Sequence, residues 1–416
     1  MSPPALESRP PSRGRRVTAK NIVFCADGTW NGPGEPEEHD RGGNPTNVFK
    51  LFLNLAGELS AGTLRSADEQ ERVLVAPDGS PQQIAKYLHG VGDSDNFLAK
   101  VLGGVGGAGL VTRVVRGYTF VSRNYQVGDR IFIIGFSRGA YTARALAGLI
   151  AARGLLDARQ VDLAANREQA YRLGSAEWFA YRREALKGRQ DWLNKLQEVA
   201  FDLPGFLQAP PRAPRIADVE MEAVVVWDTV GSLGIPAYNL KTDTQLDAFQ
   251  FADLRLSAKV KNGRHIVAVD ERRGNFTPTL WDPEQRIVQV LCPGSHSDVG
   301  GGYPMDGNQS GLSDGTLQWV TGELTRLQVA FAATPTVTLR PDACGVSHAP
   351  WDDPPWDLLP RGPRTFPGRL VVHQSVLDRL GCGARLAAGQ SPYNPANLSG
   401  AYLAGAAVSS GVTVVV

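Results

Sequence analysis

The sequence lacks the features on which several classes of protein depend. Its formal net charge is only +1, from 43 Lys and Arg residues against 42 Asp and Glu residues, so no overall field attracts nucleic acid or an anionic membrane. No run approaches the roughly 18 to 20 continuous apolar residues of a membrane-spanning helix, so any peripheral contact with lipid must be local. There is no HExxH motif and no Cys or His pair at metal-ligand spacing, which argues against a metal site. The 42 % of apolar and 20 % of charged residues are typical of a globular protein.

Cysteine is also scarce, and the four that occur form no C-x-x-C pair. Cys25 and Cys292 lie in strand-like apolar runs, so we interpret the cysteines as small core residues that require no oxidising compartment. The first residues are rich in Pro, Ser and Arg and lack the apolar segment of a Sec-type signal peptide. We therefore expect residues 1–20 to form a disordered tail and the protein to be cytoplasmic.

Short apolar runs alternate with helical patterns along the rest of the chain. The runs typical of strands are 21–25, 71–75, 85–89, 130–134, 221–227 and 285–291. The patterns typical of helices are 46–52, 111–118, 141–150 and 257–270. This alternation predicts an α/β fold with a doubly wound, mostly parallel sheet. In such a sheet, functional residues gather at the carboxyl ends of the strands.

The sequence predicts one main domain at 21–400 and a C-terminal tail at 401–416. A polar, aromatic helical insertion is expected at about 160–215, and its aromatic residues form either a lid that opens onto lipid or the packed face of a helical pair. The last 75 or so residues are rich in Gly and Pro and less periodic, so we expect them to lie outside the sheet.

The motif Gly135-Phe136-Ser137-Arg138-Gly139 is informative because of its context. It follows the apolar run 130–134 and precedes the helical pattern 141–150. A strand that turns sharply into a helix needs glycine on both sides of the turn residue, and the turn lifts the serine hydroxyl out of the sheet edge. We interpret Ser137 as an activated nucleophile.

Two further strand ends carry residues that could activate this serine. Asp228 ends the Val-rich run 221–227, and His296 lies in a glycine-dense turn after the run 285–291. A serine hydroxyl needs an imidazole to take its proton, and a carboxylate to hold that imidazole in one tautomer. The order Ser, Asp, His is that of α/β hydrolases, so we expect an α/β-hydrolase-like sheet with a catalytic triad. Of the other histidines, His265 is interpreted as a core or supporting group on a helix face.

The remaining polar residues near these strand ends leave alternatives open. Asp270 and Asp298 are rivals of Asp228 for the role of the acid, and Asp228 itself has the alternative of a turn or capping aspartate. The oxyanion hole needs two backbone N–H groups. We expect one from Arg138, and the other from Gly28 or Thr29 in the loop after the first strand.

Asp27, in the same loop, is a candidate for three roles: turn residue, cation ligand or hydrogen-bond acceptor behind the site.

The leading hypothesis from these residues is a serine ester hydrolase that acts on a lipid or another acyl ester and requires no metal or organic cofactor. The alternative is a non-catalytic binding or scaffold protein with the hydrolase fold. A fluorophosphonate probe separates the two, because an inert scaffold is not labelled.

Four segments resemble, in order, motifs of the DUF2235 family, which contains type VI secretion phospholipase effectors and related α/β hydrolases. They are 21–31 (NIVFCADGTWN), 135–145 (GFSRGAYTARA), 225–231 (VVWDTVG) and 295–303 (SHSDVGGGY). The resemblance implies that Ser137 is the family's nucleophile, with Asp228 and His296 as its partners, and that the reaction is phospholipase A-type cleavage of glycerophospholipid esters. It also implies a secretion or immunity partner and export without a signal peptide, as in type VI secretion. The chain stops at 416, before the large C-terminal extension of the long effectors, and this weakens the expectation of secretion more than that of ester hydrolysis.

Overall fold

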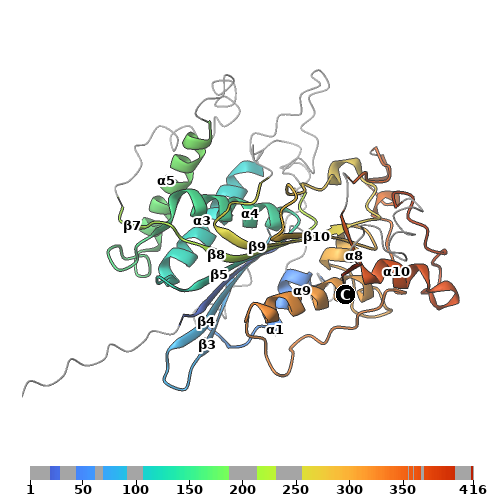
Figure 1. Cartoon of the computed structure of the whole chain (residues 1–416), viewed down its shortest axis with the longest axis horizontal. Helices are drawn as coiled ribbons and strands as arrows, with labels where there is room; N and C mark the ends of the chain where they lie inside the picture. The colour runs from blue at the N-terminus through green and yellow to red at the C-terminus, as the bar shows by residue number, and fades with distance from the viewer. Residues whose placement is uncertain are drawn as a thin grey trace, which may run out of the picture.

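The computed structural model describes residues 19–28, 44–60, 69–90, 106–186, 213–230, 255–398 apart from 355, 359 and 367–369, and 414–415. Within these ranges a ten-stranded sheet runs through the molecule, with helices on both faces (Figure 1). The α/β fold class predicted from the sequence is confirmed.

The sheet is parallel over most of its width. Its order is β12 (Val414–Val415), β11 (Val371–His373), β10 (Ile287–Cys292), β9 (Val260–Ala268), β8 (Met221–Trp227), β5 (Arg130–Phe136), β1 (Asn21–Ala26), β4 (Pro81–Leu88), β3 (Glu69–Val75) and β2 (Glu58–Leu59). Neighbours from β12 to β4 pair in parallel, and β3 and β2 continue the sheet antiparallel. The carboxyl ends of β1, β5, β8, β9 and β10 therefore lie at one edge.

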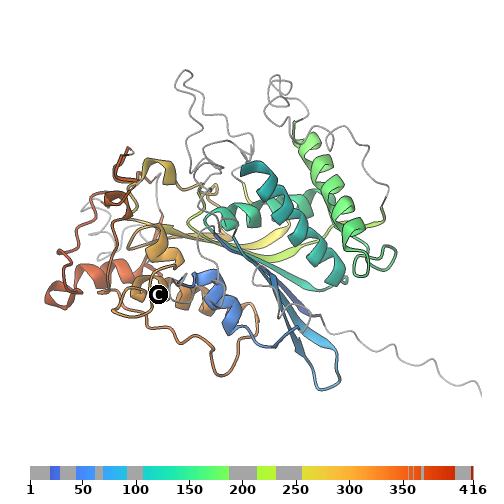
Figure 2. The ribbon, with the colours of Figure 1, turned by 180° about the vertical axis from the view of Figure 1, so that it is seen from behind.

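Helices cover the two faces of this sheet in separate groups (Figures 1 and 2). On one face lie α3 (Gly106–Asn124), α4 (Arg138–Arg153) and α5 (Arg167–Leu186), and on the other α1 (Asn47–Asn54), α8 (His296–Gly300) and α9 (Gly311–Arg326). In the sequence, α5 lies between β6 (Leu155–Leu156) and β7 (Arg215–Ile216), which pair antiparallel in a separate two-stranded sheet. None of the helices in the described ranges is both long enough and apolar enough to cross a bilayer.

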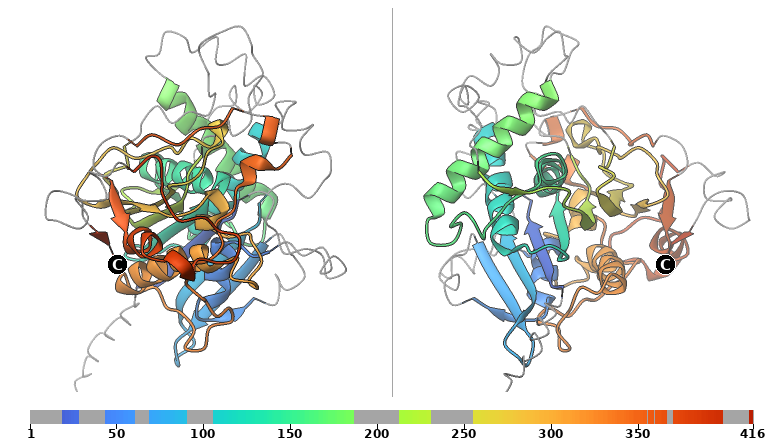
Figure 3. Two further views of the ribbon diagram at one scale, coloured as in Figure 1. Left: turned by 90° about the vertical axis from the view of Figure 1, so that its right-hand side faces the viewer. Right: turned by 60° about the vertical axis from the view of Figure 1, so that its left-hand side comes forward.

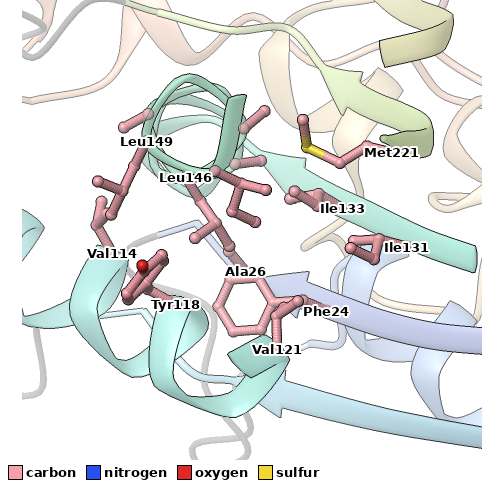
Figure 4. Packing of buried hydrophobic residues seen from close by; sticks show 14 of the residues in the cluster. Phe24, Ala26, Val114, Tyr118, Val121, Ile131, Ile133, Leu146, Leu149 and Met221 are labelled. Carbon is pink, nitrogen blue, oxygen red and sulfur yellow. The ribbon is translucent and has the colours of Figure 1, made fainter. Parts of the chain in front are cut away.

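The central strands are apolar on both sides because both sides are covered. All six residues of β1 are buried, as expected for a strand of a parallel sheet between two helical layers. On the α3 and α4 side, Phe24 and Ile133 pack against Val121 and Leu146 (Figure 4). This packing fixes β1 and β5, whose ends carry the candidate site.

The segment after α9 is part of the fold, which corrects the expectation that it lies outside the sheet. It supplies β11, helix α10 (Gln374–Leu380) and β12, and it covers the β10 end of the sheet (Figure 3, orange and red). Residues 414–415, predicted as part of a tail, form β12. Strands of two or three residues are too short to give a periodic signal in the sequence.

The interpretation of all four cysteines as core residues is wrong for two of them. Cys344 and Cys382 form a disulfide that ties the segment after α9 to the end of α10, whereas Cys25 and Cys292 are buried thiols as expected. A spacing of 38 residues gives no sequence signal for pairing.

The helix expected at 257–270 is strand β9. The segment lies between β8 and β10, and its apolar run 266–269 is buried between two layers. A short apolar run of this kind fits a buried strand as well as a helix, so the pattern alone could not decide. The other strands and helices expected up to β10 are present, with bounds that differ by a few residues. The domain bounds, the tail at 1–20 and the role of the insertion, of which 187–212 lie outside the described residues, stay predictions.

Candidate active site

Ser137 occupies a sharp turn between β5 and α4. Its φ is +56°, a left-handed conformation that a residue with a side chain rarely adopts. The turn is possible because Gly135 and Gly139 have no side chains. A Cβ at Gly135 would lie only 2.3 Å from the carbonyl oxygen of Gly139, and a Cβ at Gly139 only 2.1 Å from the carbonyl oxygen of Ala26. The expected need for glycine on both sides is confirmed. The Ser137 hydroxyl does not cap α4, and 9 % of the residue is exposed.

Asp228 and His296 meet at the same edge of the sheet. Asp228 follows β8 with a φ of +36°, and His296 is the first residue of α8. The Nδ1 atom of His296 lies 2.6 Å from Oδ2 of Asp228, and both side chains are buried. Strained non-glycine residues gather at functional sites, and both Ser137 and Asp228 are of this kind.

The ring of His296 lies beside the turn that carries Ser137. It packs on Phe136, the residue before Ser137, with ring centroids 4.6 Å apart. Phe276, in a 3-10 turn at Gly274–Phe276, contacts the same ring edge-on at 5.0 Å. The two aromatic rings thus hold the imidazole between β5 and this turn.

A buried cation, Arg364, completes the surroundings of Asp228. Its Nη1 lies 2.7 Å from Oδ1 and its Nη2 2.9 Å from Oδ2, a bidentate ion pair. The backbone N–H of Ala268 also donates to Oδ1, at 3.0 Å. Sequence reasoning missed Arg364, which lies 136 residues from Asp228 in a segment without periodic pattern.

These contacts set the charge states of the pair. Burial alone would raise the pKa of Asp228, but the charge of Arg364 and the hydrogen bond with His296 outweigh it and hold this pKa well below its usual range. Burial lowers the pKa of His296, and the bond to Asp228 opposes this only in part. An ionised carboxylate beside a neutral imidazole is the resting state that a general base requires.

Glu271 and Arg273 support His296 from the other side. The backbone N–H of His296 donates to Oε2 of Glu271 at 3.1 Å, and the same carboxylate binds Arg273 at 2.8 Å. The guanidinium of Arg273 lies 3.6 Å from the ring centre of Phe276 and 5.0 Å from that of Trp356. In the sequence, Glu271 and Arg273 directly follow the run that predicts a helix at 257–270, and no local signal gives them a role beside His296.

The two rival carboxylates are engaged elsewhere. Asp270 accepts a bond from the backbone N–H of Gly294 at 2.6 Å and another from the Tyr393 hydroxyl at 3.1 Å, and burial raises its pKa to about 6. Asp298 accepts from the backbone and hydroxyl of Ser295 and lies 2.7 Å from Nδ1 of His348. Both stabilise the loop and helix that present His296, so the geometry favours Asp228 as the acid.

His265 lies on β9, not on a helix, and is a satisfied core residue. Its Nε2 accepts the backbone N–H of Thr229 at 3.1 Å, and burial lowers its pKa to about 3.

Among the residues expected for the oxyanion hole, Arg138 and Gly28 flank Ser137. Arg138 opens α4, and a Cβ built on Gly28 would lie 3.3 Å from that of Ser137. The N–H of Gly28, however, donates to Oδ1 of Asp27 at 2.6 Å. Thr29 lies outside the described residues and stays an expectation.

Asp27 acts as a hydrogen-bond acceptor behind the site. Besides Gly28, it accepts from the hydroxyls of Thr46 and Tyr87, each at 2.7 Å. Burial raises its pKa, and these three bonds oppose the rise. Its partners are donors and not metal ligands, and no group of three or more His, Cys, Asp or Glu residues in the described part of the chain could hold a metal ion.

Comparison with known proteins places the chain in a family. A family model described as "T6SS, Phospholipase effector Tle1-like, catalytic domain" matches residues 20–323. The chain belongs to this family. The resemblance read from the four sequence motifs is confirmed, and Arg364 lies beyond the matched residues.

The chain is similar to a curated protein and to a solved structure. An uncharacterized protein of Saccharomyces cerevisiae, YEL023C, is 28 % identical over 287 residues, which are 66 % of this chain and 34 % of the yeast protein. A solved structure of the Tle1 effector bound to the VgrG spike of the type 6 secretion system is 16 % identical, covers 72 % of this chain and 56 % of that one, and superposes with a TM-score of 0.33. The chain thus spans about a third of the curated relative and about half of the solved one.

Proposed function

We propose that this Tle1-like domain is a serine ester hydrolase of the phospholipase A or esterase type, with Ser137, His296 and Asp228 as its triad. The observation that carries the proposal is the 2.6 Å bond between Asp228 and His296, made at the strand edge where the strained Ser137 turn also ends. Membership of a phospholipase effector family supports the reaction class. The bidentate Arg364 contact supports an ionised Asp228.

The proposed reaction follows from these roles. Nε2 of neutral His296 takes the hydroxyl proton of Ser137 as the oxygen attacks the ester carbonyl, and Asp228 stabilises the resulting imidazolium. The tetrahedral intermediate collapses, the C–O bond to the leaving alcohol breaks, and His296 returns its proton to that alcohol. Water, deprotonated in turn by His296, then attacks the acyl-enzyme, which releases the fatty acid and restores Ser137.

The negatively charged oxygen of the tetrahedral intermediate must be stabilised by hydrogen-bond donors near Ser137. The backbone N–H of Arg138 is the first proposed donor, and that of Thr29 or Gly28 the second. For Gly28 this role requires that its bond to Asp27 break. The buried guanidinium of Arg113 donates to the backbone oxygen of Asp27 and adds positive charge on this side of the site.

A phospholipid or another acyl ester is the proposed substrate, with peripheral contact to its bilayer. The family supports this choice, and Phe276, which contacts His296, and Trp356, which contacts Phe276, supply aromatic side chains near the site. We also propose export by the type VI secretion route, with a secretion or immunity partner. The Cys344–Cys382 disulfide supports export over the cytoplasmic alternative, because disulfides persist in oxidising compartments.

The test is a panel of p-nitrophenyl esters and fluorescent phosphatidylcholine, with the wild type beside Ser137→Ala. We expect the variant to lose turnover of every substrate that the wild type cleaves, with an unchanged circular dichroism spectrum. Ser80→Ala, in the turn between β3 and β4, is the matched control and should behave as the wild type. Undiminished turnover by Ser137→Ala ends the proposal, and a wild type inert on the whole panel favours the scaffold alternative.

A further inference from the structure

Arg364 reaches the candidate site from outside the part of the chain that defines the family. It lies beyond the matched residues 20–323 and inside the loop that the Cys344–Cys382 disulfide closes. Its guanidinium is nevertheless buried and bonded to both oxygens of Asp228. The same group donates to the backbone oxygens of Ala268 and Phe276, at the end of β9 and in the turn under the His296 ring.

We propose that Arg364 is a positioning residue of the active site, which keeps Asp228 ionised and turned toward Nδ1 of His296. The proposal rests on the proposed hydrolase function and adds a fourth residue to its triad. Asp228 has no exposure to solvent, and a carboxylate in such a place is costly unless it is paired. A neutral imidazole supplies no charge, so in the resting state the positive charge that neutralises the Asp228 carboxylate is that of Arg364.

The planar fork of the guanidinium also fixes the carboxylate geometrically. Two parallel N–H···O bonds fix the orientation of the carboxylate plane of Asp228, and the bond to the backbone oxygen of Ala268 fixes the guanidinium itself. With the carboxylate held, Oδ2 stays 2.6 Å from Nδ1 of His296. A lysine at 364 would keep the charge and lose this two-point contact.

Arg364 also affects how readily His296 takes a proton. Its Nη2 and Nδ1 of His296 bind the same oxygen, Oδ2, so the guanidinium repels an imidazolium and shares the carboxylate that would stabilise it. The other charges near the ring are Glu271, under its backbone N–H, and Arg273, which is paired to Glu271. His265, which is neutral in its buried position, lies within the electrostatic reach of both Asp228 and the cation of Arg144. Since all of these remain in an Arg364 variant, its effect on the titration of the pair can be isolated.

The experiment compares the wild type with Arg364→Met, Arg364→Lys and the control Arg361→Met. Arg361 lies in the same disulfide loop but is half exposed and pairs with Asp352. Two titrations are recorded. The first is the acid limb of the pH profile of kcat/KM for a p-nitrophenyl ester. The second follows, by proton NMR, the low-field resonance of the Asp228–His296 hydrogen bond as a function of pH, and it needs no substrate.

We expect Arg364→Met to move both titrations to higher pH by roughly one unit or more, because removal of a nearby cation raises the apparent pKa of the pair, whichever member binds the proton. Arg364→Lys should shift less than half as far, and Arg361→Met should not shift. If Arg364→Met does not fold, Arg364→Gln, which keeps hydrogen-bond donors without charge, carries the same prediction.

A loss of kcat/KM that is equal at every pH, with both titrations unmoved, would show that Arg364 only stabilises the fold and overturns the inference. If the wild type cleaves no substrate, the proposed function fails, and the proton signal still decides whether Arg364 sets the charge state of the Asp228–His296 pair.

Discussion

Replacement of Asp228 by Asn tests the choice of acid with little change in shape. An amide cannot stabilise the imidazolium of His296, and its NH₂ group favours the wrong tautomer of the ring. Where such a pair supports a serine nucleophile, this change costs about 10³- to 10⁴-fold in kcat. We therefore expect the activation barrier to rise by about 4 to 5.5 kcal/mol.

The same substitution should weaken the fold, for a reason visible in the contacts. Arg364, buried and bonded to both oxygens of Asp228, would face an uncharged amide. Removal of one partner of a buried ion pair costs about 3 to 5 kcal/mol. We expect Asp228→Asn to lower the free energy of unfolding by an amount of this order, measured by urea denaturation.

Asp270→Asn and Asp298→Asn are the matched controls, because both carboxylates lie at the same edge, Asp298 buried and Asp270 partly buried, and bond other groups. Assayed on the same p-nitrophenyl ester under conditions where each variant is folded, they should keep kcat within about tenfold of the wild type. A loss of 10³-fold in either control, together with an active Asp228→Asn enzyme, would refute the assignment of the acid.

Three further outcomes follow from the structure. Because burial lowers the pKa of His296, the neutral form of its ring persists to lower pH. A pH profile of kcat/KM should therefore fall only at a pH below about 6.5, the pKa of an ordinary imidazole. The double variant Cys344→Ser and Cys382→Ser should lose up to about 4 kcal/mol in urea unfolding, since the disulfide closes a 38-residue loop, and an unchanged midpoint would contradict this. Gly139→Ala, whose Cβ would meet a backbone oxygen at 2.1 Å, should lower the stability by about 1 to 3 kcal/mol or more, whereas Gly322→Ala in α9, with open space around it, should raise it slightly.

The parts of the site that the sequence predicts are those with a local signal. Ser137 lies in a strand–turn–helix motif with its own glycines, and Asp228 and His296 each follow a recognisable apolar run. In a parallel sheet, residues that follow different strands meet at one edge, so three local signals suffice to predict that they gather. The 2.6 Å contact between Asp228 and His296 is the kind of detail that only the packed structure provides.

Arg364 could not be predicted in the same way. It lies in an irregular segment without periodicity, and its partner is 136 residues away, so only tertiary packing reveals the pair. The Cys344–Cys382 disulfide, which helps to hold that segment, has no recognisable spacing either. The sequence predicts a helix where β9 lies, because the buried apolar end of this strand fits both periods and the choice depends on its neighbours β8 and β10.

The most direct test of the central claim is the site of covalent labelling by a fluorophosphonate. An activated serine attacks the phosphorus, whereas a serine without a base does not react at a comparable rate. We expect peptide mapping of the labelled wild type to find one adduct, on Ser137, and no adduct in Ser137→Ala. An unlabelled wild type, or an adduct on another residue that persists in Ser137→Ala, would contradict the account.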